Sequence, residues 1–268
     1  MDKSRSHGAT PAPSTEVSRE IAASPTTLWS IVTDQARFSA WMEGDIAFEP
    51  RPDSPFRAEF PNHHIVIGGE IRSVDPDARR LELTWGIESG PQADDYPAGS
   101  SLVEIRVRPE GTGSRVYLRH TGLPSKEAAR QQEGGWRFQL SRLDLVANRI
   151  DLGAGLERTL PRWVAAWNAT DPEERIGILG RICDRNVEFR DDWTAIRGVD
   201  PLNAHIGNCH RYMPGYSLEH TGDIRICRGE ALAGWRATGP GGKPMEGLNH
   251  IRAEPDGTIR RVTGFRTT

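Results

Sequence analysis

Apolar and polar residues alternate along most of the first half of the chain, a period typical of β-strands with one buried face. The predicted strands are Val17–Ile21, Asp45–Glu49, Phe56–Phe60, Ile65–Val74, Arg80–Trp85, Ser100–Arg108 and Arg115–Thr121. Two short helices are expected after the first strand, one capped by Ser24 and the other covering Ala36–Met42. The polar stretch Glu88–Gly99 carries Pro and Gly, and it predicts a loop that could act as a lid.

After Ser125 the period changes to 3.6 residues, which predicts a long helix to about Arg149. Its apolar face would carry Trp136, Leu140 and Leu143. An antiparallel sheet must bury one face, and this helix is the large element available to cover it. The pattern therefore predicts a curved sheet that grips one helix and leaves a cavity between them.

The second half begins at Asp151 and predicts three helices and a second sheet. The first helix is indicated by apolar residues at helical spacing around Trp163. The second starts at Asp171-Pro172, and the third starts at Asp200-Pro201 and ends near Met213. The predicted strands are Asn186–Arg190, Ser217–Arg228, Glu230–Thr238, Met245–Glu254 and Thr258–Arg266. Three helices against a curved sheet predict a cone with an open mouth.

The length of 268 residues favours two domains. We expect a disordered leader over 1–16, a first domain over 17–149 and a second over 151–268. The net charge of −3 and the pI of about 6.3 argue against nucleic acid as a partner. The sequence has no apolar run of the roughly 18 residues that a membrane helix needs.

Three cysteines without CxxC spacing favour neither a disulfide framework nor a zinc site, and they suit a reducing cytoplasm. His205 and Cys209 stand four residues apart on one helix, but two ligands are too few to predict a metal site. His63 and His64 are expected at the entry of a strand, on opposite faces. Nucleotide-binding and serine-hydrolase motifs are lacking, so we expect no cofactor.

The first half resembles the SRPBCC (START-like) superfamily, in particular the bacterial relatives of the activator of the heat-shock-ninety ATPase. The matching residues are Ser24–Trp29 with Trp41, Gly69–Ile71, Val74–Pro76, Leu81–Trp85 and Gly135-Trp136. The resemblance implies a helix-grip fold. Members of that superfamily include lipid carriers, polyketide cyclases and co-chaperones, so the fold leaves the function open.

The second half resembles the SnoaL-like group of the nuclear transport factor two-like superfamily. The matching residues are Val187–Asp191, Arg197–Leu202, Met213–Gly215, Asp256–Ile259 and Val262–Phe265. The resemblance implies a cone-shaped, cystatin-like α+β barrel. The expected fold class of the whole chain is therefore α+β, a helix-grip domain followed by this cone.

Within that superfamily the ketosteroid isomerases offer a mechanistic comparison. Asp191 lies where those enzymes keep a general base, Trp163 replaces a tyrosine, and Asn249 replaces a protonated aspartic acid. The resemblance implies that Trp163 and Asn249 would donate hydrogen bonds to an oxyanion. Burial at the rim of an apolar cone is expected to raise the pKa of Asp191. Alternatively, Asp191 and Asp192 only solvate a strand end or pair with Arg190 or Arg197.

Eight tryptophans are spread over both halves, and aromatic walls are common in small-molecule pockets. Core packing explains most of them equally well. The residues that we predict to contact a ligand are Trp193, Trp167, His205, Trp235, Trp85 and Trp136. Trp193 is the first choice, because it follows the candidate base in a predicted mouth loop.

These observations predict a protein that binds a small hydrophobic or amphipathic molecule in one or both cavities. It would be a cofactor-independent cyclase, isomerase or lyase of polyketide- or terpenoid-like carbonyl compounds, with Asp191 moving a proton. The alternatives are a non-catalytic carrier or sensor, and a chaperone-associated protein. A homodimer through the C-terminal domain and a cytoplasmic location are further expectations.

Overall fold

The computed structural model describes residues 12–267, and these fall into two compact units. The first unit contains Leu28–Glu110 and Ser114–Leu143 with the chain before Ile21. The second unit contains Asp144–Thr268 and two short segments, Ile21–Thr27 and Gly111–Gly113. Contacts within the chain divide it between Leu143 and Asp144, and the domain bounds at 149 and 151 stay a prediction.

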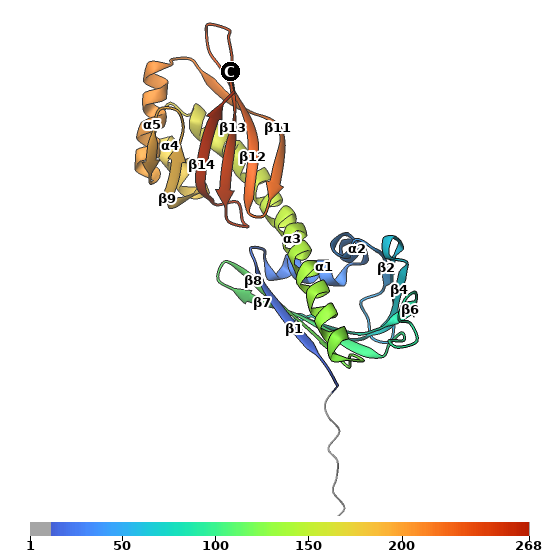
Figure 1. Ribbon diagram of the computed structural model, residues 1–268. Helices are drawn as coiled ribbons and strands as arrows, with labels where there is room; N and C mark the ends of the chain where they lie inside the picture. Colours follow the sequence, from blue (N-terminus) through green and yellow to red (C-terminus); the bar gives the residue numbers. More distant parts are fainter. Residues whose placement is uncertain (1–11, 268) are drawn as a thin grey trace, which may run out of the picture. The chain divides into compact units, whose positions relative to one another are not determined.

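The alternating segments of the first half form an eight-stranded sheet that curves around helix α3 (Lys126–Asn168) (Figure 1). The strand order is β1-β8-β7-β5-β4-β3-β2, with β6 paired to β4. The strands are β1 (Thr15–Ile21), β2 (Asp45–Phe48), β3 (Pro55–Phe60), β4 (Ile65–Asp75), β5 (Arg80–Trp85), β6 (Ile87–Ser89), β7 (Ser101–Glu110) and β8 (Gly113–Thr121). Buried and outward-facing residues alternate along β5 and β7, because one face is covered.

Helices cover that face. They are α1 (Pro25–Thr33), α2 (Gln35–Met42) and the N-terminal part of α3. Ser24 caps α1 by accepting the backbone N–H of Thr27 at 3.1 Å, as predicted. The buried Trp136 ring of α3 packs against Trp85 of β5, with ring centroids 5.2 Å apart. The predicted helix-grip arrangement is confirmed.

The interior of the first unit contains a buried polar network around His120. Trp136 Nε1 donates to His120 Nδ1 at 3.0 Å, so the ring proton lies on Nε2. That nitrogen lies 2.8 Å from both the Tyr96 hydroxyl and the Ser101 hydroxyl. Burial lowers the pKa of His120 to about 3, which keeps the imidazole neutral. The network is therefore satisfied internally and fixes the packing of this core.

The second unit has a six-stranded sheet in the order β10-β9-β14-β13-β12-β11. Its strands are β9 (Cys183–Arg190), β10 (Ala195–Arg197), β11 (Ser217–Cys227), β12 (Glu230–Thr238), β13 (Met245–Ala253) and β14 (Ile259–Arg266). All neighbouring strands are antiparallel except β9 and β14. The C-terminal part of α3, α4 (Pro172–Ile182) and α5 (Val199–Tyr212) lie on one side of the sheet (Figure 1). The predicted α+β fold class is thus confirmed.

The core of the second unit lies between these helices and the sheet. Leu156 and Trp163 of α3, Leu202 of α5, and Ile251 and Val262 of the sheet are among its buried members. Asp171 caps α4 by accepting the backbone N–H of Glu173 at 3.1 Å. The sequence pattern predicted both features, because apolar spacing and caps are local properties.

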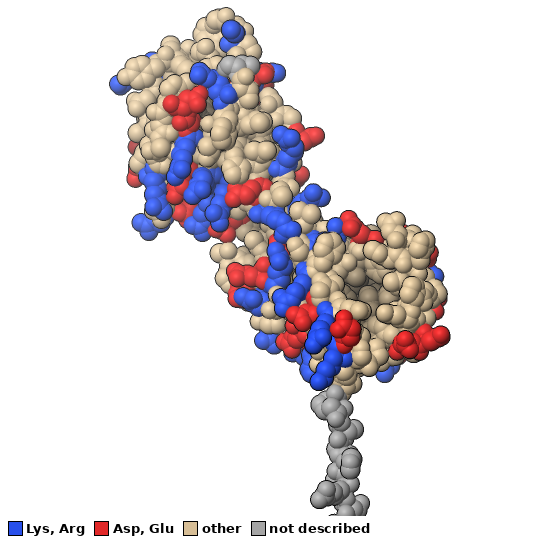
Figure 2. All heavy atoms as spheres, in the orientation of Figure 1, with Lys and Arg blue, Asp and Glu red and all other residues tan. Residues whose placement is uncertain are grey.

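The visible surface of the protein carries acidic and basic side chains next to one another (Figure 2). In the second unit, Arg260 contacts both Asp184 and Glu254 at 2.6 Å, and Arg261 contacts Glu188 at 2.8 Å. These pairs break up the charge into small patches of alternating sign. Within residues 12–267, no helix combines the length and apolar character needed to cross a membrane.

Several predicted boundaries were wrong. The two helices expected on either side of residue 150 are one continuous helix, which runs through Gly153 and Gly155. Leu152 and Leu156 are buried in the core of the second unit, and this packing stabilises the helix across the two glycines. The predicted leader over 1–16 lies outside the described residues up to 11, and Thr15 and Glu16 already belong to β1. His63 ends a short 3-10 helix and His64 has a left-handed φ of 53°, so the pair does not enter a strand together.

Candidate functional site

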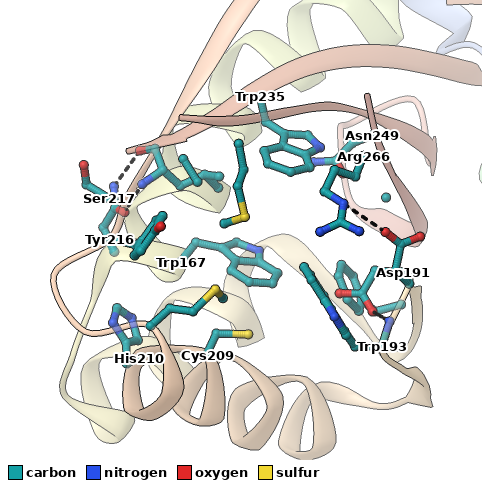
Figure 3. A pocket seen from close by; sticks show the side chains of 18 of the residues that line it. Trp167, Asp191, Trp193, Cys209, His210, Tyr216, Ser217, Trp235, Asn249 and Arg266 are labelled. Atoms are coloured by element: carbon teal, nitrogen blue, oxygen red, sulfur yellow. Dashed lines mark hydrogen bonds and ion pairs between the residues drawn. The ribbon is translucent and has the colours of Figure 1, made fainter. Parts of the chain in front are cut away.

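A cavity of about 110 Å³ lies in the second unit, between the helices and the inner face of the sheet. Its lining is mainly aromatic and apolar. Trp163 and Trp167 come from α3, and Trp235 comes from β12. The predicted residues Asp191, Trp193 and Asn249 also line it, and Figure 3 shows Asp191, Trp193 and Asn249 together near one end. Six of the predicted site residues are thus brought to one cavity, and their roles remain predictions.

Two indole groups of the cavity wall have no hydrogen-bond acceptor among the described residues. They are Nε1 of Trp163 and Nε1 of Trp167, and both atoms are buried. Trp163 is 2% exposed, and the two rings lie 6.0 Å apart. Both rings also pack against Phe189 of β9. An unpaired buried donor costs about 1–3 kcal/mol, so an acceptor inside the cavity would relieve a real penalty.

Asp191 follows the end of β9 and is held from two sides. Its Oδ1 accepts the backbone N–H groups of Trp193 at 2.9 Å and Thr194 at 2.8 Å, which forms a local Asx turn. Its Oδ2 lies 3.4 Å from Nε2 of His205 on α5. The side chains of Asp191 and His205 are only 12% and 13% exposed. The carboxylate therefore has little contact with solvent and a fixed orientation.

These contacts set the charges of the pair. Burial alone raises the pKa of Asp191, but the His205 contact and the two backbone N–H groups outweigh it and lower that pKa below its ordinary value. Burial likewise lowers the pKa of His205, but Asp191 and Cys209 outweigh it and raise that pKa to about 9. At neutral pH the pair is a carboxylate next to an imidazolium. The prediction of a raised Asp191 pKa was wrong, because a partner from α5 compensates for burial.

The alternative pairing of Asp191 with Arg190 or Arg197 was also wrong. Arg190 lies 3.5 Å from Glu188 instead, and the basic partner of Asp191 is His205. His205 itself does not line the cavity, although we predicted it as a ligand contact. It lies against the rings of Trp167 and Phe189, whose centroids are 6.0 Å and 5.3 Å away. Its place is behind the cavity wall, in contact with groups that do line it.

Cys209 is a cavity residue that the sequence analysis considered only for metal binding. It stands one helical turn after His205 on α5, and its Sγ lies 3.8 Å from Nε2 of His205. Cys209 lines the cavity, so thiol, imidazole and carboxylate form one connected group at its wall. The i,i+4 spacing was the available signal, but the spacing alone does not show what lies opposite the helix face.

Asn249 lies across from Asp191 on the sheet side. Asn249 of β13 pairs with Gly264 of β14, and a Cβ placed on Gly264 would lie 3.4 Å from Asn249 Oδ1 and 3.7 Å from Asp191 Cβ. The amide and the carboxylate thus flank the bare backbone of Gly264. This glycine keeps open the space between them.

The mouth of the cavity carries an exposed aromatic residue and a cation. Trp193 is 59% exposed, and the Arg266 guanidinium lies 5.4 Å from its ring centroid. Arg266 Nε also lies 3.4 Å from Asp192 Oδ2. The sequence analysis missed Arg266, because strand alternation did not show that β14 ends at the mouth.

Trp85 and Trp136 are predicted ligand contacts that lie elsewhere. They are 5% and 3% exposed in the core of the first unit, where they pack against each other and against His120. They do not line the cavity of the second unit. Among the described residues, no group of three or more His, Cys, Asp or Glu side chains is placed to hold a metal ion.

Comparison with known proteins found a matching family model and similar solved structures. Residues 22–148 match the family model described as Activator of Hsp90 ATPase homolog 1-like protein. The resemblance predicted for the first half is therefore confirmed. No curated protein matches the chain.

Solved structures similar to either half are known. A SnoaL-like family protein from Agrobacterium tumefaciens is 23% identical, with 42% of this chain and 98% of that chain covered and a TM-score of 0.40. CalU16 from Micromonospora echinospora is 26% identical, with 52% and 78% covered and a TM-score of 0.39. The Aha1 dimer from Colwellia psychrerythraea is 14% identical, with 49% and 93% covered and a TM-score of 0.41. Each similarity spans about half of the chain, and none assigns an activity to it.

Proposed function

We propose that the second unit binds a small, mainly apolar molecule that carries a carbonyl or similar oxygen acceptor. The observation that supports this proposal is the pair of buried indole N–H groups at Trp163 and Trp167, which lack an acceptor in an otherwise apolar cavity. A bound oxygen atom would satisfy one or both donors. A hydrocarbon of the same shape would leave them unpaired, so the cavity would discriminate between the two ligands.

The dimensions of the cavity favour a ligand whose enclosed part is no larger than one ring. An apolar cavity of about 150 Å³ accommodates a benzene ring, and the volume here is about 110 Å³. A longer polyketide- or terpenoid-like molecule would have to extend through the mouth. There Trp193 offers an exposed aromatic face and Arg266 a cation. We therefore expect the enclosed part of the ligand to be a compact apolar group with its oxygen at the indoles.

Turnover is a second candidate, because Asp191, Asn249 and Trp163 line the same cavity. A carboxylate next to a carbonyl held by N–H donors could move a proton at the adjacent carbon, as an isomerase, cyclase or lyase requires. The lowered pKa of Asp191 makes this carboxylate a weak base, so we rank binding, as in a carrier or sensor, above catalysis. A chaperone partner for the first unit, a homodimer and a cytoplasmic location remain predictions.

One matched pair of ligands tests binding. Acetophenone and α-methylstyrene have nearly the same shape, but only acetophenone has an oxygen acceptor. We expect acetophenone to bind about 5- to 10-fold more tightly, as one neutral hydrogen bond of about 1 kcal/mol allows. The double variant Trp163→Phe, Trp167→Phe should bind both equally in ligand-observed NMR. Equal binding to the wild-type protein, or none, would refute the proposal.

The same ketone tests turnover. If Asp191 moves a proton, the methyl protons of acetophenone exchange with D2O faster in the presence of the protein, and Asp191→Asn abolishes the acceleration. Exchange at the solvent rate together with intact binding would leave a carrier or sensor as the function.

A further inference from the structure

We propose that Cys209 is a nucleophile of this cavity, and that the second unit takes α,β-unsaturated carbonyl compounds and binds them covalently through its sulfur. This inference rests on the proposed function, because it uses the same cavity and the same two indole donors. It adds the electrophilic class of the ligand and a second attachment point on the protein.

The first support is the position of the sulfur. Cys209 lines the cavity from α5, and Figure 3 shows its side chain and the Trp167 ring within the same space. Its Sγ lies 3.8 Å from Nε2 of His205, and the same nitrogen lies 3.4 Å from Oδ2 of Asp191. Asp191 keeps His205 protonated, and the imidazolium nitrogen that contacts the carboxylate is also the one nearest to the thiol. A thiolate formed at Cys209 would have a cation directly beside it.

The second support is independent of the cysteine. Trp163 lines the cavity and is 2% exposed, and its buried N–H has no acceptor among the described residues. This donor and that of Trp167 suit a carbonyl oxygen. An enone places such an oxygen in conjugation with an electrophilic carbon two bonds beyond the carbonyl carbon. A cavity with N–H donors and a thiol in its wall offers a partner to each end of that group.

The other two cysteines show that this environment is specific to Cys209. Cys183 is buried in the core of the second unit, where burial raises the pKa of its thiol to about 12 and keeps it unreactive. Cys227 is exposed at the end of β11 and does not line the cavity. Among the described residues, Cys209 is the cysteine that combines a cavity position with an imidazole contact.

The reaction balances without an oxidant or a cofactor. The Cys209 thiol gives up its proton to water, and its sulfur bonds to the β-carbon of the enone. The electron pair of the carbon–carbon π bond moves between the α-carbon and the carbonyl carbon, and the carbonyl π pair moves to the oxygen, where an indole N–H can donate. The α-carbon then takes a proton from water as the carbonyl group re-forms. This uptake balances the proton that the thiol released, His205 stays protonated throughout, and the product is a saturated ketone joined to the protein by a thioether.

The experiment compares crotonophenone, an enone, with butyrophenone, its saturated counterpart. The full-length protein is incubated with crotonophenone, and adducts are located by intact-mass measurement and peptide mapping. We expect a single addition at Cys209, faster than that at the exposed Cys227 by about 100-fold, the lower range for one oriented donor to a developing oxyanion. Excess butyrophenone should protect Cys209 and leave the rate at Cys227 unchanged.

Variants separate the roles of the residues. Cys209→Ser should remove the fast addition, and Cys227→Ser, the matched control, should retain it. His205→Gln should slow addition at Cys209 without changing the rate at Cys227 in the same molecule. This internal ratio also controls for misfolding, since an unfolded chain would expose both thiols alike.

The outcomes distinguish this inference from the proposed function. If butyrophenone binds but crotonophenone forms no adduct, or reacts only at Cys227, the covalent inference is overturned and the proposed function stands. If neither ketone binds, both are overturned. Fast and protectable addition at Cys209 supports both.

Discussion

The ion pair between Asp191 and His205 makes the stability of the second unit depend on pH in a defined direction. Because the pKa of His205 is raised in the folded protein, folding gains stability from its protonation. That stability is fully present below the unfolded-state pKa of about 6.5 and is lost as the pH rises through the folded-state pKa of about 9. We therefore expect the second unit to weaken between these two values.

The size of the effect follows from the two pKa values. The difference between 6.5 and about 9 corresponds to about 3 kcal/mol of stability at low pH, most of which is lost by pH 9. The side chains are 13% and 12% exposed, so solvent screening is small. The lowered pKa of Asp191 reflects the same contact, so its contribution to stability is not added to that of His205. For a unit of this size, about 3 kcal/mol corresponds to a shift in melting temperature on the order of 10 °C.

Thermal unfolding followed by tryptophan fluorescence from about pH 6 to pH 9.5 measures this effect. The variant His205→Gln has no titrating ring, so the difference between its curve and that of the wild-type protein should shrink as the pH rises. His210→Gln is the matched control, because His210 is the neighbouring cavity histidine whose Nε2 has no hydrogen-bond partner among the described residues. Parallel curves for wild-type protein and His205→Gln would refute the ion pair.

Two further predictions concern His120 in the first unit and Gly264 beside the cavity. Because the pKa of His120 is lowered to about 3, its contribution to stability is present above about pH 6.5 and is lost as the pH falls, by up to about 1.4 kcal/mol per pH unit. Acid unfolding of the wild-type protein and of His120→Gln measures this loss. The same dependence of unfolding free energy on pH in both proteins would contradict it. Gly264→Ala places a methyl group at ordinary contact distance from Asn249 and Asp191. We expect a melting temperature within a few degrees of that of the wild-type protein, but a loss of acetophenone binding of about tenfold or more. Undiminished binding would show that the ligand does not reach the space beside Gly264.

Much of the fold could be predicted, because it depends on patterns of residues that are close together in the sequence. Alternation along β5 and β7, the caps at Ser24 and Asp171, and the helical spacing around Trp163 each depend on residues close in sequence. The continuous helix α3 was missed for the same reason. A polar residue such as Asp151 is compatible with both a cap and a helix interior, and only its tertiary surroundings decide between them.

The candidate site was predicted less completely, because its chemistry depends on pairings between distant elements. The motif containing Asp191 pointed to the mouth of a cone, but its partner His205 comes from a separate element, α5. Burial and pairing shift a carboxyl pKa in opposite directions, so the direction could not be known before the partner was. The missing acceptors at Trp163 and Trp167 are likewise invisible in a sequence, which shows that a donor exists but not whether it is satisfied.

The charge state of this wall changes where reactivity is expected in the cavity. A carboxylate that accepts two backbone N–H groups and faces an imidazolium is stabilised as an anion, and each of those interactions must weaken when it takes a proton. Asp191 is therefore better suited to holding His205 protonated and oriented than to removing a proton from a ligand. The imidazolium in turn faces the sulfur of Cys209, which has no such restraint and lines the same cavity. If the thiol is the reactive group, Asp191 and His205 can stay paired, and their opposite charges cancel. The wall can then carry three ionisable groups and still accept a neutral, apolar ligand.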